Sequence, residues 1–224
     1  MKVLLTKTRS EDKWANVALR CPHCGHYGTF ERLSGIKDVL ALEESVLSYF
    51  LGLRRCPNAE CHGHLFFIAD HVGLVNITYP NSTIPFNKEN IPEKILNAFS
   101  EAISCHSNNC FIASAIMIRK TLEEICKDRG AVGKTLYDRL QDLSTKIVVP
   151  KELRDGMQEL RLLGNDAAHI ESNTFGEIGK EEIEVSIEFT QEILKAVYQY
   201  ESLLGKLRGL KKANVQEAEE AKKV

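Results

Sequence analysis

The sequence contains no long apolar run and no strong excess of charge of either sign. Asp70 and His71 interrupt one of its most apolar stretches, HLFFIADHVGLVNI, so we expect no membrane-spanning helix. The apolar run from Val3 to Leu5 is too short for the core of a signal peptide, and charged residues follow it closely. These absences predict a cytoplasmic protein with no membrane partner.

Positive and negative residues nearly balance. Lys and Arg number 29 and Asp and Glu number 31, which gives a formal net charge of −2. Such a chain has no general electrostatic attraction to nucleic acid or to an anionic membrane. Residues 90–210 carry 15 basic and 19 acidic residues and are mildly acidic. Near the N-terminus, Arg20, Arg32, Arg54 and Arg55 form either a local basic patch or ordinary surface charges.

Four of the seven cysteines form two short pairs, CPHC at Cys21 and Cys24 and CPNAEC at Cys56 and Cys61. In a reducing compartment these thiols are not expected to form disulfides. Two such turns instead supply the four corners of a tetrahedral Zn²⁺ site. The sequence therefore predicts a structural zinc site with these four ligands, and reduced, unligated thiols are the alternative. A closed four-cysteine site performs no chemistry by itself.

The residues around the cysteine pairs also suit metal-binding turns. Pro22 and Pro57 restrict the backbone, and Gly25 and Gly63 permit the positive φ that turns N–H groups toward thiolates. Because four cysteines complete the ligand set, we expect the neighbouring histidines to lie outside it: His23, His26, His62 and His64. The other cysteines are predicted to be small core or near-core residues: Cys105, Cys110 and Cys126.

Short apolar stretches alternate with turn signals in residues 13–70, which predicts short β-strands around the cysteine turns. We assign residues 1–75 to a zinc-ribbon domain. The segment 33–50 exceeds what a minimal ribbon needs and is open to a strand, a helix or a long hairpin. Three prolines and four asparagines in residues 76–92 predict a linker, which we place at 76–90.

Apolar residues recur at helical spacing from Ile91 to about residue 210. Proline, asparagine and glycine signals divide this helical domain, residues 91–210, into five predicted helices, at about 92–106, 108–129, 134–146, 150–169 and 180–207. The charged residues 211–224 are predicted to be a flexible tail. The predicted fold class is α+β, a small β-rich zinc ribbon followed by a five-helix bundle.

The predicted fifth helix has more apolar surface than one neighbour requires. One stripe contains Phe189, Ile193, Ala196, Tyr200, Leu203 and Leu207, and a second contains Ile183, Ile187, Leu194, Val197 and Leu204. A central position within its own bundle explains two stripes, and a homodimer helix explains them as well. Both arrangements stay open, and a homodimer is the expected assembly.

The predicted fourth helix carries a polar stripe beside its apolar face. At about 100° per residue, the stripe contains Arg154, Gln158, Arg161, Asn165 and His169. This stripe is either a solvated face or a functional surface. On the predicted second helix, Arg119 and Glu123 are four residues apart, so they can form an ion pair that orients a neighbour or only stabilises the structure.

Four segments of the sequence resemble one known family: CPHC, CPNAEC, AIMIRKTLEEIC and LRLLGNDAAH. They are similar to the prokaryotic domain of unknown function 4145 family, which is placed in the HEPN superfamily (higher eukaryotes and prokaryotes nucleotide-binding). The resemblance spans residues 14–208 and is most specific at GNDAAH and at the helix with Arg119. It implies an HEPN-like helical bundle, and such proteins often occur beside or within restriction and phage-defence systems.

HEPN ribonucleases cleave RNA without a metal ion, at a site generally built across a dimer from an Arg followed by four to six residues and a His. In them the His moves a proton at the ribose 2′-hydroxyl or the leaving oxygen, and the Arg holds the phosphate. The resemblance maps these roles onto His169 and Arg161, with Asn165 as a polar helper and Arg119 and Glu123 in support. Seven residues separate Arg161 from His169, so this chain departs from the family spacing.

The sequence supports three functional hypotheses. The leading one is a zinc-containing HEPN-like module that associates with nucleic acid or a protein partner in prokaryotic defence or stress response. The second is a metal-independent ribonuclease with a composite dimer site. The third is a non-enzymatic dimeric scaffold whose zinc ribbon docks another protein. The expected cofactor is structural Zn²⁺, and the expected partners are a second copy of the chain, RNA or a defence-system protein.

Overall fold

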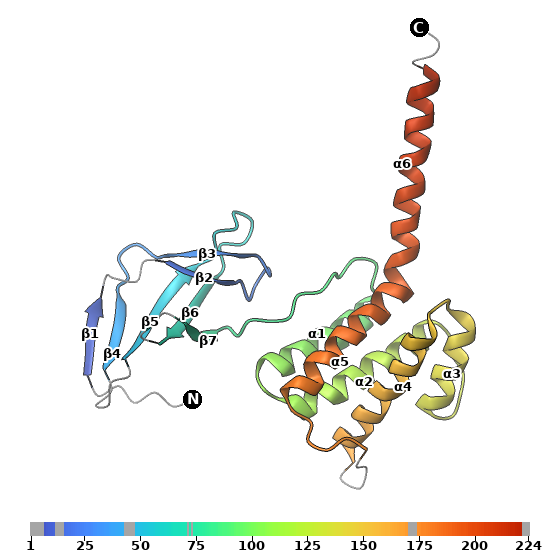
Figure 1. The fold of residues 1–224 in the computed structure, drawn as a ribbon, viewed down its shortest axis with the longest axis horizontal. Helices are drawn as coiled ribbons and strands as arrows, with labels where there is room; N and C mark the ends of the chain where they lie inside the picture. The colour runs from blue at the N-terminus through green and yellow to red at the C-terminus, as the bar shows by residue number, and fades with distance from the viewer. Residues whose placement is uncertain are drawn as a thin grey trace. The chain divides into compact units, whose positions relative to one another are not determined.

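The computed structural model describes residues 7–11, 16–42, 48–70, 72, 74–169 and 174–220. The chain divides into two compact units, residues 1–85 and 86–224. Strands make up the regular structure described in the first unit, and helices make up that of the second (Figure 1). The predicted α+β fold class is confirmed.

The N-terminal unit is a seven-stranded antiparallel sheet. Its strands are β1 (Lys7–Glu11), β2 (Asn16–Arg20), β3 (Tyr27–Arg32), β4 (Asp38–Leu42), β5 (Ser48–Arg55), β6 (His64–Ala69) and β7 (Val75–Tyr79). β5 is central because β6 pairs with one of its edges while β4 and then β3 share the other. β1 pairs with β4, β2 with β3, and β7 with β6.

β4 and β5 form a hairpin, which was one of the three alternatives for residues 33–50. Leu42 pairs with Ser48, and the antiparallel register continues to Val39 opposite Leu51. Residues 43–47 lie outside the described residues. The apolar, aromatic and β-branched content of these segments suits a pleated, half-buried surface. The long spacing between the two cysteine pairs therefore adds two strands to the sheet.

The apolar core of this unit follows the alternation of its strands. In β6, Leu65, Phe67 and Ala69 are buried while Phe66 and Ile68 are only partly buried, because successive side chains of a strand point to opposite faces. Burial of one large aromatic side chain contributes about 2 to 3 kcal/mol. The other core residues are Val17, Leu19, Phe30, Phe50 and the cysteines Cys21 and Cys56.

A buried ion pair lies within this sheet. Arg54 on β5 donates from Nη1 to Oδ1 of Asp38 at 2.8 Å and from Nη2 to Oδ2 at 2.6 Å, and neither side chain is exposed. The guanidinium also lies over the ring of Phe67, 4.6 Å from its centroid. Gly52 leaves room for the pair, since a Cβ there would clash with the Asp38 carboxylate. The prediction that Arg54 is a surface residue is therefore wrong.

β7 lies partly within the region predicted as a linker. It pairs with β6, with Tyr79 opposite Phe66. The linker prediction is therefore wrong for residues 76–79, where Ile, Thr and Tyr favour a strand at the sheet edge. From Pro80 to Pro92 the chain forms neither helix nor strand, and the two units divide after Pro85.

The C-terminal unit contains the five predicted helices: α1 (Glu93–Ser107), α2 (Phe111–Asp128), α3 (Leu136–Lys146), α4 (Lys151–Ala168) and α5 (Lys180–Leu194). The fifth continues through a π-helical turn, η1 (Lys195–Gln199), into α6 (Tyr200–Glu220). Part of the predicted flexible tail is therefore helical in the structure, and residues 221–224 lie outside the described residues. None of the described helices combines the length and apolarity needed to cross a membrane.

Local signals set the helix boundaries. Pro92 directly precedes α1, where its missing N–H costs no helical bond. Thr135 caps α3: its hydroxyl accepts from the Asp138 N–H at 3.2 Å, and the Asp138 carboxylate accepts from the Thr135 N–H at 3.0 Å. These two bonds form a capping box. Cys110 is the N-cap of α2 and makes no side-chain capping hydrogen bond.

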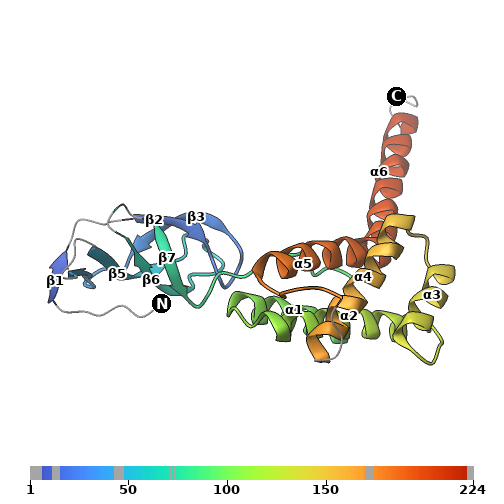
Figure 2. The same ribbon diagram turned by 60° about the horizontal axis from the view of Figure 1, so that its bottom comes forward.

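Two glycines of α4 allow close packing with neighbouring helices. A Cβ on Gly156 would clash with the ring of Phe189 on α5. A Cβ on Gly164 would lie 2.5 Å from the Cβ of Arg119 on α2. The neighbour of Gly164 is thus the stem of an arginine side chain. Figure 2 shows α4 crossing close to α2 and α5.

The three cysteines of the helical unit differ in their surroundings. Cys126 is buried, and burial raises the pKa of its thiol to about 11. Cys105 is partly buried, as predicted for a core or near-core residue. Cys110 is exposed, so the core prediction is wrong for this residue. Its position in the turn before α2 explains the exposure, since that turn lies outside the packed helix faces.

Candidate metal centre and helical polar cluster

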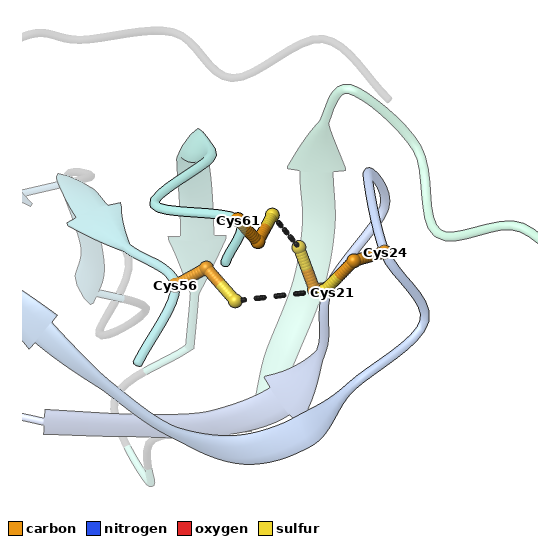
Figure 3. A group of neighbouring side chains, drawn as sticks. All are labelled: Cys21, Cys24, Cys56 and Cys61. Carbon is orange, nitrogen blue, oxygen red and sulfur yellow. Dashed lines mark hydrogen bonds between the residues drawn. The ribbon is translucent and has the colours of Figure 1, made fainter. Parts of the chain in front are cut away.

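Two turns of the N-terminal unit bring the four predicted zinc ligands together (Figure 3). Cys21 follows β2, and Cys24 lies in the turn toward β3. Cys56 follows β5, and Cys61 lies in the turn before β6. All four Sγ atoms lie within 4.8 Å of one another, and the Cys21–Cys61 and Cys24–Cys56 separations are both 3.8 Å.

This spacing fits a tetrahedral metal ion. With Zn–S bonds of about 2.3 Å, tetrahedral geometry places two sulfurs about 3.8 Å apart. A disulfide would require about 2.05 Å, and all four cysteines are free. Within the described residues no other group of His, Cys, Asp or Glu gathers as a candidate metal site. The four cysteines therefore form a candidate metal-binding site.

The backbone of both turns is arranged around the sulfurs. Gly25 has φ of +74°, a left-handed conformation that favours glycine. The N–H of His23 donates to Cys21 Sγ, and that of Gly63 donates to Cys61 Sγ, both at 3.4 Å. These N–H groups offset negative charge on the sulfurs, as expected for thiolate ligands. Gly63 does not have the positive φ that the sequence interpretation assigned to it.

The thiols of the cluster differ in pKa. A hydrogen bond from the backbone of His26 lowers the pKa of Cys24 to about 7. Burial raises the pKa of Cys56 to about 12, and the nearby thiols of Cys21 and Cys24 contribute to the rise. Negative charge on one sulfur opposes ionisation of the next. A bound cation would relieve this repulsion by coordinating all four thiolates.

The histidines near the turns lie outside the cysteine cluster, as predicted. The ring of His23 hydrogen bonds through Nε2 with the backbone carbonyl of His64 at 2.9 Å, which identifies Nε2 as the donor. This bond connects the first cysteine turn with the start of β6. Gly63 leaves room for the His23 ring, since a Cβ there would clash with it. His23 therefore supports the geometry of the two turns.

In the helical unit, part of the predicted catalytic set lies together. Arg119 on α2 donates from Nη1 to Oδ1 of Asn165 on α4. The Nε atom of Arg119 also lies 3.4 Å from the carboxylate of Glu123, so the expected ion pair is present. Gly164 allows this approach between the helices. Arg119, Glu123 and Asn165 therefore form a polar cluster on two helices.

The other two predicted catalytic residues have different surroundings. Arg161 donates from Nε to Oε1 of Gln158 at 2.9 Å and lies over the ring of Tyr137, 5.5 Å from its centroid. His169 is the exposed C-cap of α4, and its backbone N–H donates to the Asn165 carbonyl at 2.9 Å. No side-chain contact joins Arg161 to His169 among those found in the described residues.

A cavity of about 420 Å³ lies between α4 and α5, and the sequence interpretation did not identify it. Apolar side chains form most of its surface, and three carboxylates belong to its lining. The lining residues are Gly156, Glu159, Leu160, Leu163, Phe175, Glu181, Glu182, Val185, Ser186 and Phe189. The one sequence signal was Gly156, a glycine within a helix that often marks a close neighbour.

An antiparallel sheet with a four-cysteine cluster, followed by a helical unit, defines a two-unit α+β protein with a candidate metal-binding site. A family model described as "Domain of unknown function (DUF4145)" matches residues 100–217, slightly more than half of the chain. The chain belongs to this family. The match lies within the helical unit and does not include the cysteine turns. No curated protein and no solved structure matches the sequence.

Proposed function

We propose that the four cysteines bind one structural Zn²⁺ ion in a zinc ribbon, and that the chain is an HEPN-like module that associates with nucleic acid in prokaryotic defence or stress response. The observation that carries the metal assignment is the pair of 3.8 Å Sγ–Sγ separations. Four thiolates suit Zn²⁺ and leave no open position for a substrate. Free thiols also agree with a reducing, cytoplasmic setting.

Metal analysis of chain purified under reducing conditions tests the zinc proposal. We expect one zinc per chain in the wild type and a large loss in Cys61→Ser. Cys110→Ser is the matched control, because this cysteine is exposed and belongs to the helical unit. A wild-type zinc content far below one per chain, or equal contents in both variants, would contradict the assignment.

The nucleic-acid proposal rests on the family resemblance and on one exposed aromatic residue beside the first cysteine turn. Tyr27 is 65% exposed and lies opposite Arg20 across the β2–β3 pair. Arg20 donates from Nη1 to the Gly25 carbonyl at 2.7 Å, which holds this cation at the turn. An exposed ring near a cation suits stacking with an unpaired base. We therefore expect single-stranded RNA to bind this face and to dissociate at higher salt.

Fluorescence anisotropy with a labelled single-stranded RNA tests this binding. Loss of one stacking ring costs about 1 to 3 kcal/mol, so Tyr27→Ala should weaken binding by about 5- to 150-fold. Tyr79→Ala is the control, because Tyr79 is also exposed but lies on β7. Absence of binding at low salt, or equal effects of the two variants, would contradict the proposal.

A second candidate function is metal-independent RNA cleavage in the helical unit. The observation that favours it is the contact of Arg119 with Asn165, beside Glu123. An arginine oriented in this way can hold a phosphate, and His169, four residues beyond Asn165, can transfer a proton. In this proposal one arginine holds the phosphate. Arg161 has this role by the family resemblance, and Arg119 is the alternative because the spacing of Arg161 from His169 departs from that of the family.

Incubation of RNA with the zinc-loaded protein, without added metal, tests cleavage. We expect His169→Ala to slow cleavage by at least about 100-fold, the usual contribution of a general acid or base. Arg119→Ala and Arg161→Ala then show which arginine is used. Lys151→Ala is the control, since this basic residue lies exposed on the same helix but outside the polar stripe. Equal cleavage by wild type and folded His169→Ala would exclude this function.

The non-enzymatic scaffold is the remaining proposal. Like the ribonuclease hypothesis it includes a homodimer, but it requires neither RNA cleavage nor RNA binding. A stable dimer that shows no RNA binding at moderate salt would favour the scaffold. Salt-dependent RNA binding would contradict it.

A further inference from the structure

The first half of α6 exposes an apolar stripe. Tyr200, Leu203, Leu207 and Leu210 are spaced by three, four and three residues, so they share one face of the helix. Each is more than half exposed, and the three leucines are between 63% and 65% exposed. In α5, by contrast, Ile183 and Ile187 are fully buried in the unit's own core. The apolar surface predicted for the fifth helix is thus used internally only in its first part.

The two parts of this long helix also differ in charge. α5 contains five glutamates and one lysine. Residues 203–212 of the sequence contain four basic residues and no acidic residue. Lys206 and Arg208 lie on either side of the leucine stripe. A second copy in antiparallel orientation would place this basic segment beside acidic α5, whereas a parallel copy would place like charges together.

The cavity between α4 and α5 offers a place for apolar side chains. Leu160, Leu163, Val185 and Phe189 contribute to its apolar surface. Glu159 and Glu181, both exposed, also belong to its lining. A suitable occupant therefore combines large aliphatic side chains with flanking cations. The exposed stripe of α6 has this composition.

The α6 stripe of the same chain is too far along the helix to fill this cavity. About 22 residues separate Val185 from Leu207, which at about 1.5 Å per residue is about 33 Å of continuous helix. We propose that the occupant is α6 of a second copy: α5, η1 and α6 pair antiparallel across a two-fold axis, and each α6 packs over the α4–α5 cavity of the partner. This interface specifies the homodimer proposed above and does not depend on zinc or RNA.

Sedimentation velocity of the full chain over a range of concentrations tests the interface. We expect the wild type to dimerise and Leu207→Glu to raise the dimer dissociation constant by at least about 30-fold, as for a central apolar interface residue. Gly205→Glu is the matched control, because it adds the same charge on the opposite side of α6, where a Cβ has no neighbour within 4 Å. Circular dichroism checks that both variants keep their helices.

Charge reversal tests the antiparallel arrangement. Lys206→Glu with Arg208→Glu, and separately Glu159→Lys with Glu181→Lys, should each weaken the dimer by about tenfold or more. Mixing these two variants should restore dimers, since each contact then joins opposite charges. A wild type that stays monomeric at about 100 µM would overturn the proposal, because even a weak dimer with a dissociation constant of about that size would then be detected. A wild-type dimer that Leu207→Glu does not weaken, or mixed variants that stay monomeric, would overturn this interface, although the homodimer itself would stand.

Discussion

The two units of the chain are stabilised by different means. In the described part of the N-terminal unit, nine buried residues form the apolar core, and two of them are cysteines of the candidate metal centre. In the described part of the C-terminal unit, 23 apolar residues between Ile91 and Tyr198 are buried. Small cores supply little stability, and structural metal sites commonly make up the difference. From this comparison we expect the sheet, and not the helices, to depend on a metal ion bound by the four cysteines.

The buried polar groups show the same contrast. The sheet contains the paired charges of Asp38 and Arg54, which contact each other across different strands. Apart from His106, the buried polar side chains described in the helical unit are hydroxyls that donate to backbone carbonyls, such as Ser114 to Ala102 at 2.8 Å and Thr190 to Ser186 at 2.7 Å. Removal of one charged residue leaves the opposite charge buried and unpaired, which costs more folding free energy than the loss of one hydroxyl hydrogen bond. The N-terminal unit should therefore be more sensitive to single substitutions.

The largest expected effect is loss of the sheet when one cysteine of the metal centre is replaced. Cys56→Ser removes a buried candidate ligand, and without the metal the small core should not hold the N-terminal unit folded. Amide NMR spectra should then lose the dispersed strand signals while helical circular dichroism persists. A variant that keeps the sheet folded would show that the apolar core suffices.

The next effect concerns the buried ion pair. Asp38→Ala leaves the Arg54 guanidinium buried without its carboxylate, which should destabilise the N-terminal unit by about 3 to 5 kcal/mol. Urea unfolding followed at the strand signals measures the change. Replacement of both residues, Asp38→Ala with Arg54→Met, should recover much of the loss, and a double variant as unstable as the single one would contradict this explanation.

A core substitution in α2 gives the converse comparison. Leu122 is fully buried, so Leu122→Ala should destabilise the helical unit by about 2 to 5 kcal/mol. The zinc content and the strand signals should not change, because the two units have separate cores. If the strand signals and the helical signals of Leu122→Ala disappeared in one unfolding transition, the two units would not be independent.

The smallest effect is a pH dependence at the start of α3. Hydrogen bonds from the backbone and hydroxyl of Thr135 lower the pKa of Asp138. The carboxylate therefore stabilises the folded state above its ordinary pKa of about 4, and this contribution is lost as the pH falls through the lower folded value. Below pH 4 the free energy of unfolding of the helical unit, measured with denaturant, should fall less in Asp138→Asn than in the wild type. Equal pH profiles would contradict the assignment.

Much of this architecture is local and therefore predictable. The two cysteine pairs predicted the candidate metal site, because ligand spacing within each pair is a short-range property. Pro92 and the helical apolar pattern placed the start of α1 to within a residue. The hairpin of β4 and β5 was only one of three alternatives, since a short apolar run fits a strand or a helix until its pairing partner is known.

Contacts between distant residues were not predictable in the same way. Arg54 resembled its surface neighbour Arg55 in the sequence, but its burial depends on Asp38, 16 residues earlier. Arg119 and Asn165 were each candidates, yet their contact joins two residues that are 46 positions apart and lie on different helices. The α4–α5 cavity likewise arises from the packing of two helices and has no sequence motif of its own.

Hydrogen exchange on the full chain, before and after removal of zinc by a chelator, measures whether the metal centre keeps the N-terminal unit folded. We expect one zinc per chain before treatment. After removal, amides of β2, β3, β5 and β6 should lose protection while those of α1, α2, α4 and α5 keep it. A chain whose strands stay equally protected without metal would contradict the claim that the metal centre holds the N-terminal unit together.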